Sequence, residues 1–385
     1  MARYLESHEP QLWLWFGSAQ AHGEYTESLR LALLKQTYRL DADAHPELAA
    51  RAAAAGQALG LGCPITLYQA SQAVGANAAL FFAPGEAHIV LSGPLIATLT
   101  PAEMQAVFGH ELAHYQLWQH EGGRYLVAER LLAGIAANPR ASASHQESAR
   151  RFRLFTEIFA DRGALAAAPD LPTVVAALVK AETGLHEVSG ASYLKQADEI
   201  FAQSSVKTEG LDHPETFIRA RALRLWSEGG TGVDEQVAAM IRGRDRLEEL
   251  DLLEQVELTE TTRSLLEQLL SPPWFRTEAT LASARIFFPD FDPAAEEGAA
   301  GIDRLAPAAR RFPDYFGYLL LDFAVADPDL EDLPLAAAWM WAERLEIGAA
   351  FEKIAVRELR LKPRELKRLK QEATTRLAAA GAAGK

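Results

Sequence analysis

The sequence predicts a mainly α-helical chain with one small β-sheet (α+β), followed by an all-helical region. Alanine-rich segments with apolar residues at helical spacing make up most of the chain. Two neighbouring segments, CPITLYQA (63–70) and NAALFFAPGEAHIVLSG (77–93), carry β-branched and aromatic residues instead. WSEGGTGVDEQ (226–236) places three glycines between two apolar regions. We interpret it as a linker and expect two domains, residues 1–228 and 229–385.

The composition is typical of a soluble globular protein. Of the 385 residues, 49% are hydrophobic and 23% are charged, and this length suffices for two domains. The net charge of −14 disfavours nucleic acid or an anionic membrane as the main partner. The single cysteine, Cys63, excludes an internal disulfide and a cysteine metal cluster. Because the sequence shows neither a secretion signal nor a long apolar run, we expect a cytoplasmic protein without a transmembrane segment.

The predicted elements follow in a simple order. Residues 24–60 are expected to form one or two helices. The segments 63–70 and 77–93 are expected to form the sheet, with a hairpin at the turn signal Pro84–Gly85. Helical periodicity dominates from Pro94 onward, and the region beyond the linker is expected to be entirely helical.

One predicted helix has a well-marked beginning in LTPAEMQAVFGHELAHY (99–115). Thr100 suits the N-cap, Pro101 suits the first helical position, and Glu103 completes a capping box. Apolar residues then recur at helical spacing, which predicts a helix through the histidines that follow.

This helix carries two histidines and a glutamate in the pattern HExxH. His110 and His114 lie one turn apart on one face, and Glu111 lies beside them. Two imidazoles on adjacent turns can bind one zinc ion, and the glutamate can act as general base on a zinc-bound water. An ordinary helix can carry the same residues by chance. Because a catalytic zinc needs three protein ligands and an open position, the prediction depends on the third ligand.

His120 is the first candidate for that ligand. In the pattern HExxHxxGxxH, a glycine turns the chain so that the third histidine meets the metal, but the corresponding residue here is Leu117. On a continuous helix, six residues rotate a side chain by roughly 240° from His114. We therefore interpret His120 as a surface histidine near the end of the helix.

The second candidate is Glu157, in FTEIFADRGAL (155–165). Glu157 and Asp161 are four residues apart on another predicted helix, and the surrounding phenylalanines predict an apolar packing side for it. Glu157 would bind the metal, and Asp161 could accept a hydrogen bond from a ligand imidazole and fix its tautomer. The alternative is a solvated acidic helix face.

Several segments in the same order resemble the M48 family of zinc metallopeptidases. Residues 77–115 resemble the family's Asn-Ala edge strand, its LTxxE helix start and its HExxH motif. EIFAD (157–161) matches the pattern ExxAD, and DHPETFIR (212–219) resembles a Thr-His-Pro segment followed by an arginine. The resemblance covers roughly residues 40–225 and implies a gluzincin-type zinc metallopeptidase domain. Two features depart from the family: Asp212 replaces the threonine, and the transmembrane helices of many relatives are missing.

The resemblance implies one Zn²⁺ ion bound by His110, His114 and Glu157, with Glu111 as the general base. Two neutral imidazoles and one carboxylate leave the site net positive, which lowers the pKa of a bound water towards about 7. Glu111 would take the proton of this water as it attacks a peptide carbonyl and pass it to the leaving amine. Protein or peptide substrates would bind along the edge strand near residues 77–83.

His213 and Arg219 become further candidate catalytic residues through the same resemblance. Either could stabilise the oxyanion. Pro214 restricts His213 to extended backbone, so His213 lies in a loop from which it could reach the metal. In some family members the corresponding histidine blocks the open coordination position. We favour the blocking role, which predicts a latent or regulated zinc endopeptidase.

The C-terminal half is expected to bind a regulatory protein partner. Residues 315–359 alternate apolar helical faces with an acidic turn and faintly resemble TerB-like domains, although helix capping also explains the acids. The alternative to a peptidase is a zinc-binding scaffold or interaction protein that keeps the metallopeptidase fold and does not cleave. Neither a ligand nor the base is missing here, which favours the enzyme.

Overall fold

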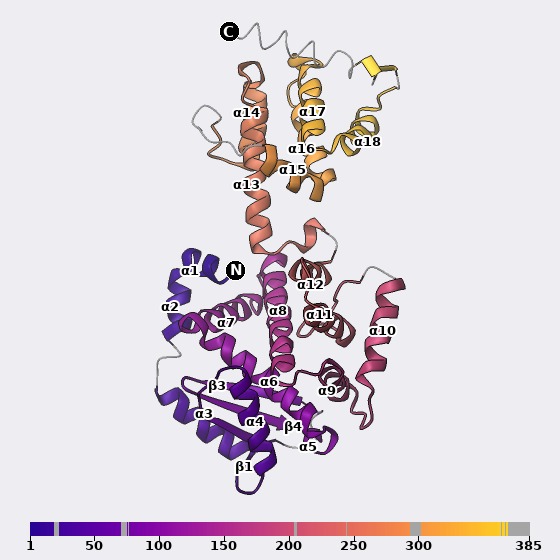
Figure 1. Cartoon of the computed structure of the whole chain (residues 1–385). Helices are drawn as coiled ribbons and strands as arrows, with labels where there is room; N and C mark the ends of the chain where they lie inside the picture. The colour runs from indigo at the N-terminus through magenta and orange to yellow at the C-terminus, as the bar shows by residue number, and fades with distance from the viewer. Residues whose placement is uncertain are drawn as a thin grey trace. The chain divides into compact units, whose positions relative to one another are not determined.

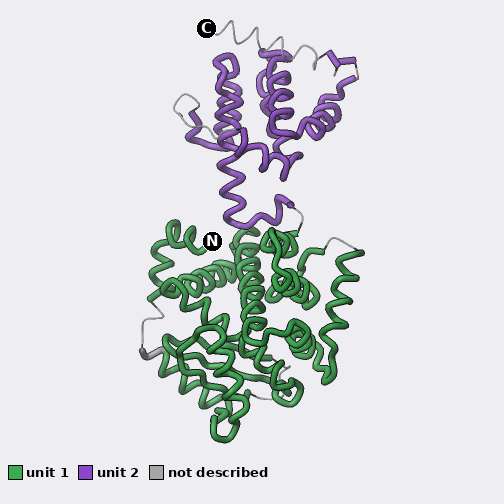
Figure 2. The backbone as a smooth tube through the Cα atoms, in the orientation of Figure 1, with its two compact units in different colours: residues 1–244 green, residues 245–385 purple. Residues whose placement is uncertain are grey.

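The chain forms two compact units, residues 1–244 and residues 245–385 (Figure 2). The computed structural model describes residues 1–18, 23–70, 75, 77–203, 206–243, 245–292, 302–362, 364–365 and 367–368. Each unit has its own hydrophobic core, so each is described by itself.

The first part of unit 1 contains the sheet (Figure 1). Its elements are α1 (Ala2–His8), α2 (Pro10–Ser18), α3 (Gly23–Gln36), β1 (Tyr38–Leu40), α4 (Pro46–Ala58), β2 (Ile65–Gln69), β3 (Asn77–Ala83) and β4 (Glu86–Ser92). The strand order is β1–β2–β4–β3, with β2 and β4 parallel and the other pairs antiparallel. The hairpin predicted at Pro84–Gly85 is confirmed, and Gly85 adopts the positive φ of 82° that this turn needs. β3 lies at an edge of the sheet.

Strand β1, like helices α1 and α2, is an element that the sequence analysis did not anticipate. The predicted helical region 24–60 contains two helices, but residues 38–40 between them pair with β2. Leu40 is buried in the core on the α4 and α6 side of the sheet, which explains why three residues suffice to extend it.

The rest of the described part of unit 1 is helical. Its elements are α5 (Leu95–Thr98), α6 (Pro101–Gln119), the 3₁₀ turn η1 (His120–Gly123), α7 (Arg124–Ala136), α8 (Ala143–Ala167), α9 (Leu171–Thr183), α10 (Gly190–Gln203), α11 (Thr216–Glu228) and α12 (Val233–Arg242). One face of the sheet packs against α4 and α6 around Ile89, Phe108 and Leu112. The opposite face contacts α3 through Leu33.

Helices α6 and α8 cross at a pair of glycines. A Cβ atom at Gly163 would lie 2.3 Å from the Cβ of Ala113, and one at Gly109 would lie 2.8 Å from the carbonyl oxygen of Gly163. No side chain fits at either position, so the two backbones are in direct contact. This crossing brings the histidine helix and the Glu157 helix face to face.

Of the three phenylalanines of α8 that the sequence predicts as its apolar packing side, only Phe152 packs against a buried cluster, the one formed with α1 and α7. Phe155 and Phe159 are each 37% exposed, while the small residues Ala160 and Ala164 are buried. Because α6 approaches within backbone contact, the buried face of α8 has room only for small side chains.

The division between the units lies one helix later than the sequence analysis places it. Helix α12, beyond the glycine-rich segment 229–232, packs onto unit 1 through Val237, Met240 and Ile241. These side chains contact Leu154 and Ile158 of α8 in one buried cluster. The glycines therefore form a turn inside unit 1 rather than a linker.

The described part of unit 2 consists only of helices, as predicted. They are η2 (Leu247–Glu249), α13 (Leu252–Leu269), η3 (Pro273–Phe275), α14 (Glu278–Phe287), α15 (Ile302–Arg311), α16 (Pro313–Ala324), η4 (Pro328–Leu330), α17 (Leu333–Arg344) and α18 (Gly348–Leu359). Phe316, Leu320 and Phe351 lie in its core. In the acidic turn, Asp327 accepts a hydrogen bond from the backbone N–H of Asp329, as a helix-capping acid does.

Candidate metal centre

Helix α6 begins with the predicted capping box. The Thr100 hydroxyl accepts a hydrogen bond from the Glu103 N–H at 3.3 Å, and the Glu103 carboxylate accepts one from the Thr100 N–H at 2.7 Å. The same carboxylate forms a buried ion pair at 2.9 Å with Lys180 of α9. The start of α6 is thereby fixed both by its own residues and by a neighbouring helix.

The α6–α8 crossing brings together three side chains that can bind a metal: His110, His114 and Glu157. The Nε2 atoms of the two histidines are 3.3 Å apart. His110 Nε2 is 3.4 Å from Oε2 of the Glu157 carboxylate, and His114 Nε2 is 3.4 Å from Oε1 of the same group. A tetrahedral zinc ion with bonds of about 2.0–2.1 Å separates its ligand atoms by about 3.3–3.4 Å. The spacing of the two imidazoles and the carboxylate is therefore compatible with a zinc ion.

Asp161 fixes the orientation of His110. Its Oδ1 lies 3.1 Å from Nδ1 of His110, so Nδ1–H donates to the carboxylate and Nε2 is the nitrogen left to bind a metal. The Arg219 guanidinium binds the same carboxylate twice, at 2.8 Å from Nε and 2.5 Å from Nη2. Asp161 is 1% exposed, so both contacts are made away from bulk water. The side-chain contacts from Arg219 through Asp161 to His110 thus connect α11, α8 and α6.

The charged groups at this site shift one another's pKa values. Burial disfavours the charged form of His110, but hydrogen bonds to Asp161 and Glu157 outweigh it and raise the pKa of His110 to about 10. Burial and the charge of His110 lower the pKa of His114 to about 4. Against the effect of burial, hydrogen bonds from His110 and His213 hold the pKa of Glu157 well below its usual range. The two carboxylates therefore stabilise a positive charge between them, which is what a bound cation would supply.

Glu111 and strand β3 face the same cleft as the three potential ligands. The cleft has a volume of about 750 Å³, and its lining includes Glu111, His213, Arg219 and the β3 residues 77–80. Burial raises the pKa of Glu111 above its usual value, although the charge of His110 and a backbone hydrogen bond from Leu80 oppose this shift. A carboxylate with a raised pKa beside a metal site is suited to accept a proton.

His213 lies in the loop before α11 and contacts the predicted ligand Glu157. Its Nδ1 is 2.8 Å from Glu157 Oε2, and its side chain is 60% exposed. The loop is tied to α8 by an ion pair between Asp212 and Arg153 and by a hydrogen bond from Arg150 to the Gly210 carbonyl. His213 is therefore placed at the site by contacts of the residues that precede it in the loop.

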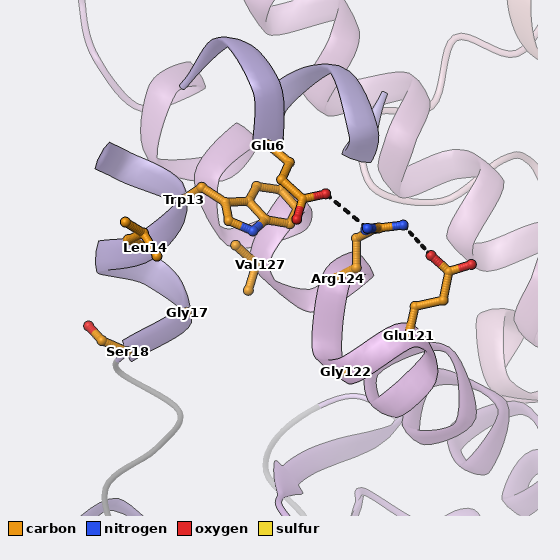
Figure 3. A pocket seen from close by; sticks show the side chains of 9 residues that line it. All are labelled: Glu6, Trp13, Leu14, Gly17, Ser18, Glu121, Gly122, Arg124 and Val127. Atoms are coloured by element: carbon orange, nitrogen blue, oxygen red, sulfur yellow. Dashed lines mark hydrogen bonds and ion pairs between the residues drawn. The ribbon is translucent and has the colours of Figure 1, made fainter. Parts of the chain in front are cut away.

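His120 points away from this group. Helix α6 ends at Gln119, and the His120 side chain is 61% exposed and 3.7 Å from the Glu121 carboxylate. The following turn lines a separate surface pocket with α1, α2 and α7, in which Arg124 bridges Glu6 and Glu121 (Figure 3).

Trp118 and Glu129 line the cleft, and the sequence analysis identified neither of them as a site residue. Trp118 lies one turn beyond His114, and its ring centroid is 5.5 Å from that of His114. Its indole N–H donates a 2.7 Å hydrogen bond to Glu129 of α7, which also lines the cleft. The available signals were the four-residue spacing from His114 and a glutamate within the apolar stretch YLVAERLLAGIAA.

Comparisons with known proteins agree with this geometry. Residues 41–227 match the model of peptidase family M48. A curated protein of Arabidopsis thaliana, "Plastoglobule-localized metallopeptidase 48, chloroplastic", is 31% identical over 157 residues. The match covers 36% of this chain and 45% of the relative, so the chain spans less than half the length of that protein. No solved structure gives a match. Within the described residues, no helix has both the length and the apolar character needed to cross a membrane.

Proposed function

Residues 41–227 belong to peptidase family M48, and from this premise we propose that the chain is a zinc-dependent endopeptidase acting on protein substrates. The observation that supports it most is the spacing of His110 Nε2, His114 Nε2 and the Glu157 carboxylate, which matches the ligand geometry of zinc. Glu111 lies in the same cleft and supplies the general base that hydrolysis needs.

The reaction divides between a metal ion and residues of the chain. A bound zinc ion would polarise the peptide carbonyl and make water more acidic. Glu111 accepts a proton from the attacking water and transfers it to the leaving amine nitrogen. The C–N bond then breaks and the amine leaves as a neutral group. The free edge of β3 holds the substrate as an added strand.

We assign Arg219 a positioning role. Its two hydrogen bonds to Asp161 engage the guanidinium, and its Nη2 lies 3.9 Å from Glu157 Oε2. Arg219 therefore neutralises Asp161 and keeps that carboxylate on His110, and it acts on the substrate only through these residues.

The substitution Glu111→Gln tests the proposal. Glutamine preserves the shape of the side chain and leaves all three ligands in place, so the variant is expected to retain one zinc ion per chain. Its hydrolysis of casein should fall by about 10²–10⁴-fold because the general base is lost. Metal analysis and a casein digestion with and without chelator measure both effects.

The outcomes distinguish a zinc peptidase from a non-cleaving scaffold. Chelator-sensitive digestion by the native chain with normal turnover by Glu111→Gln would refute the assigned mechanism. Zinc binding by the native chain without cleavage of casein or peptides would instead favour a non-cleaving scaffold.

We propose that unit 2 binds a regulatory protein partner. The family match ends at residue 227, before unit 2 begins, and unit 2 has a core of its own. A role separate from catalysis is consistent with both facts.

A further inference from the structure

Glu129 places a carboxylate in the cleft that the proposed reaction does not use. It comes from α7, whereas the potential ligands come from α6 and α8. One of its oxygens, Oε2, accepts the hydrogen bond from the Trp118 indole at 2.7 Å. Among the described residues, no lysine or arginine nitrogen lies within ion-pair distance of this carboxylate, and Oε1 accepts no hydrogen bond.

The one arginine beside it in the cleft is already paired. Arg153 lines the same part of the cleft and forms an ion pair with Asp212 of the His213 loop. Burial raises the pKa of Glu129, and the hydrogen bond from Trp118 and the charges of Arg153 and Arg130 offset this effect only in part. A cation delivered by a ligand would remove this cost.

Trp118 provides an apolar wall next to the carboxylate. Its half-buried ring lies between His114, at 5.5 Å, and Phe82 of β3, at 6.2 Å between centroids. An aromatic ring next to a carboxylate suits a side chain with an aliphatic stem and a cationic head. The stem can pack on the ring while the head reaches the carboxylate. Lysine and arginine have this form.

We propose that Trp118 and Glu129 form a specificity subsite, adjacent to His114, that binds a lysine or arginine side chain of the substrate. This inference rests on the proposed peptidase function and adds the substrate class to it. The net charge of −14 on the chain acts in the same direction, since it attracts basic peptides over longer distances.

The test uses quenched fluorescent octapeptides in which each position around the scissile bond carries lysine, norleucine or glutamate in turn. Norleucine has nearly the shape of lysine without the charge. At one position, the zinc-loaded native chain is expected to favour lysine over norleucine by about tenfold or more in kcat/KM. Glutamate at that position should be disfavoured.

The decisive variant is Glu129→Gln, which keeps an oxygen for the Trp118 N–H and removes only the charge. It is expected to bring the lysine-to-norleucine ratio to about one. Glu121→Gln, which removes an acid from the turn outside the cleft, should keep the native ratio. If Glu129 only anchors the tryptophan, Glu129→Gln will keep the native ratio, and the proposed subsite will be wrong.

A binding measurement separates failure of the subsite from failure of the peptidase proposal. Fluorescence polarisation compares the lysine and norleucine peptides on Glu111→Gln and on the double variant Glu111→Gln/Glu129→Gln, where no turnover is needed. Tighter binding of the lysine peptide that disappears with the second substitution supports the subsite even if the native chain cleaves nothing. Equal binding of both peptides to Glu111→Gln overturns it.

Discussion

Asp161 shows how a single buried residue orders the site. It holds the His110 tautomer on one side and the Arg219 guanidinium on the other. In Asp161→Asn, the amide is neutral, so its contacts with both partners weaken. The expected result is a zinc affinity about 10–100-fold lower, measured by competition with a chromophoric chelator. Asp198→Asn is the matched control, because Asp198 pairs with Arg221 and Arg224 outside the cleft and should not affect zinc. Equal affinities in the two variants would contradict the role.

His213 is predicted to support the metal site through Glu157. Because its Nδ1 lies 2.8 Å from Glu157 Oε2, His213→Ala should free this carboxylate and weaken zinc binding by about tenfold. Activity should fall at limiting zinc and recover in part at saturating zinc. His186→Ala, an exposed histidine outside the cleft lining, is the control. A rise in activity at saturating zinc would instead reveal the blocking role expected from the sequence.

The sequence predicts some of these residues better than others for a physical reason. His110 and His114 can be paired from sequence because one helical turn separates them. Glu157 is 43 residues beyond His114, and only the family resemblance connects it to them. The contacts Arg219–Asp161 and Trp118–Glu129 depend on how α11 and α7 pack, so no local pattern reveals them.

At the scale of the elements, the Lys180–Glu103 pair links α9 to the start of α6. Both side chains are less than 8% exposed. Lys180→Met should destabilise the chain by about 3–5 kcal/mol, because it leaves the Glu103 carboxylate buried without its cation. Urea unfolding followed by circular dichroism measures this loss.

The double variant Lys180→Met/Glu103→Gln checks the cause of that loss. Glutamine removes the stranded charge and still offers an oxygen to the Thr100 N–H. The double variant should therefore be more stable than Lys180→Met alone. A double variant that is less stable would show that packing around Lys180, rather than the charge, is responsible.

The elements themselves were predictable where local signals are strong. The capping box of α6 and the turn between β3 and β4 follow from residues adjacent in sequence. The sequence analysis missed strand β1 and assigned helix α12 to the second domain, because tertiary contacts decide both. Three residues form β1 only because β2 offers an edge, and α12 belongs to unit 1 only because α8 presents Leu154 and Ile158.

At the scale of the whole molecule, the position of α12 predicts where the chain can be divided. Residues 1–243 should remain folded and bind one zinc ion, because every contact of α12 with α8 is retained. Residues 1–230 lose Val237, Met240 and Ile241, which together stabilise unit 1 by roughly 5 kcal/mol. Since these residues cover α8 beside Glu157, the shorter fragment should melt at a lower temperature and bind zinc more weakly. Thermal unfolding and metal analysis of both fragments test this, and equal behaviour would refute it.

The glycine pair at the α6–α8 crossing also bears on which ions the site accepts. Two imidazoles and a carboxylate could serve several transition metals, so the donor atoms alone choose poorly among them. Calcium takes six to eight oxygen ligands at about 2.3–2.6 Å, which would require the three donor atoms to move apart. The backbones of α6 and α8 touch at Gly109 and Gly163, so the two helices are already as close as their main chains allow, and the donor atoms they carry lie correspondingly close together. Two residues that have no side chain therefore set the close spacing of the donor atoms, which suits a small ion with short bonds better than calcium.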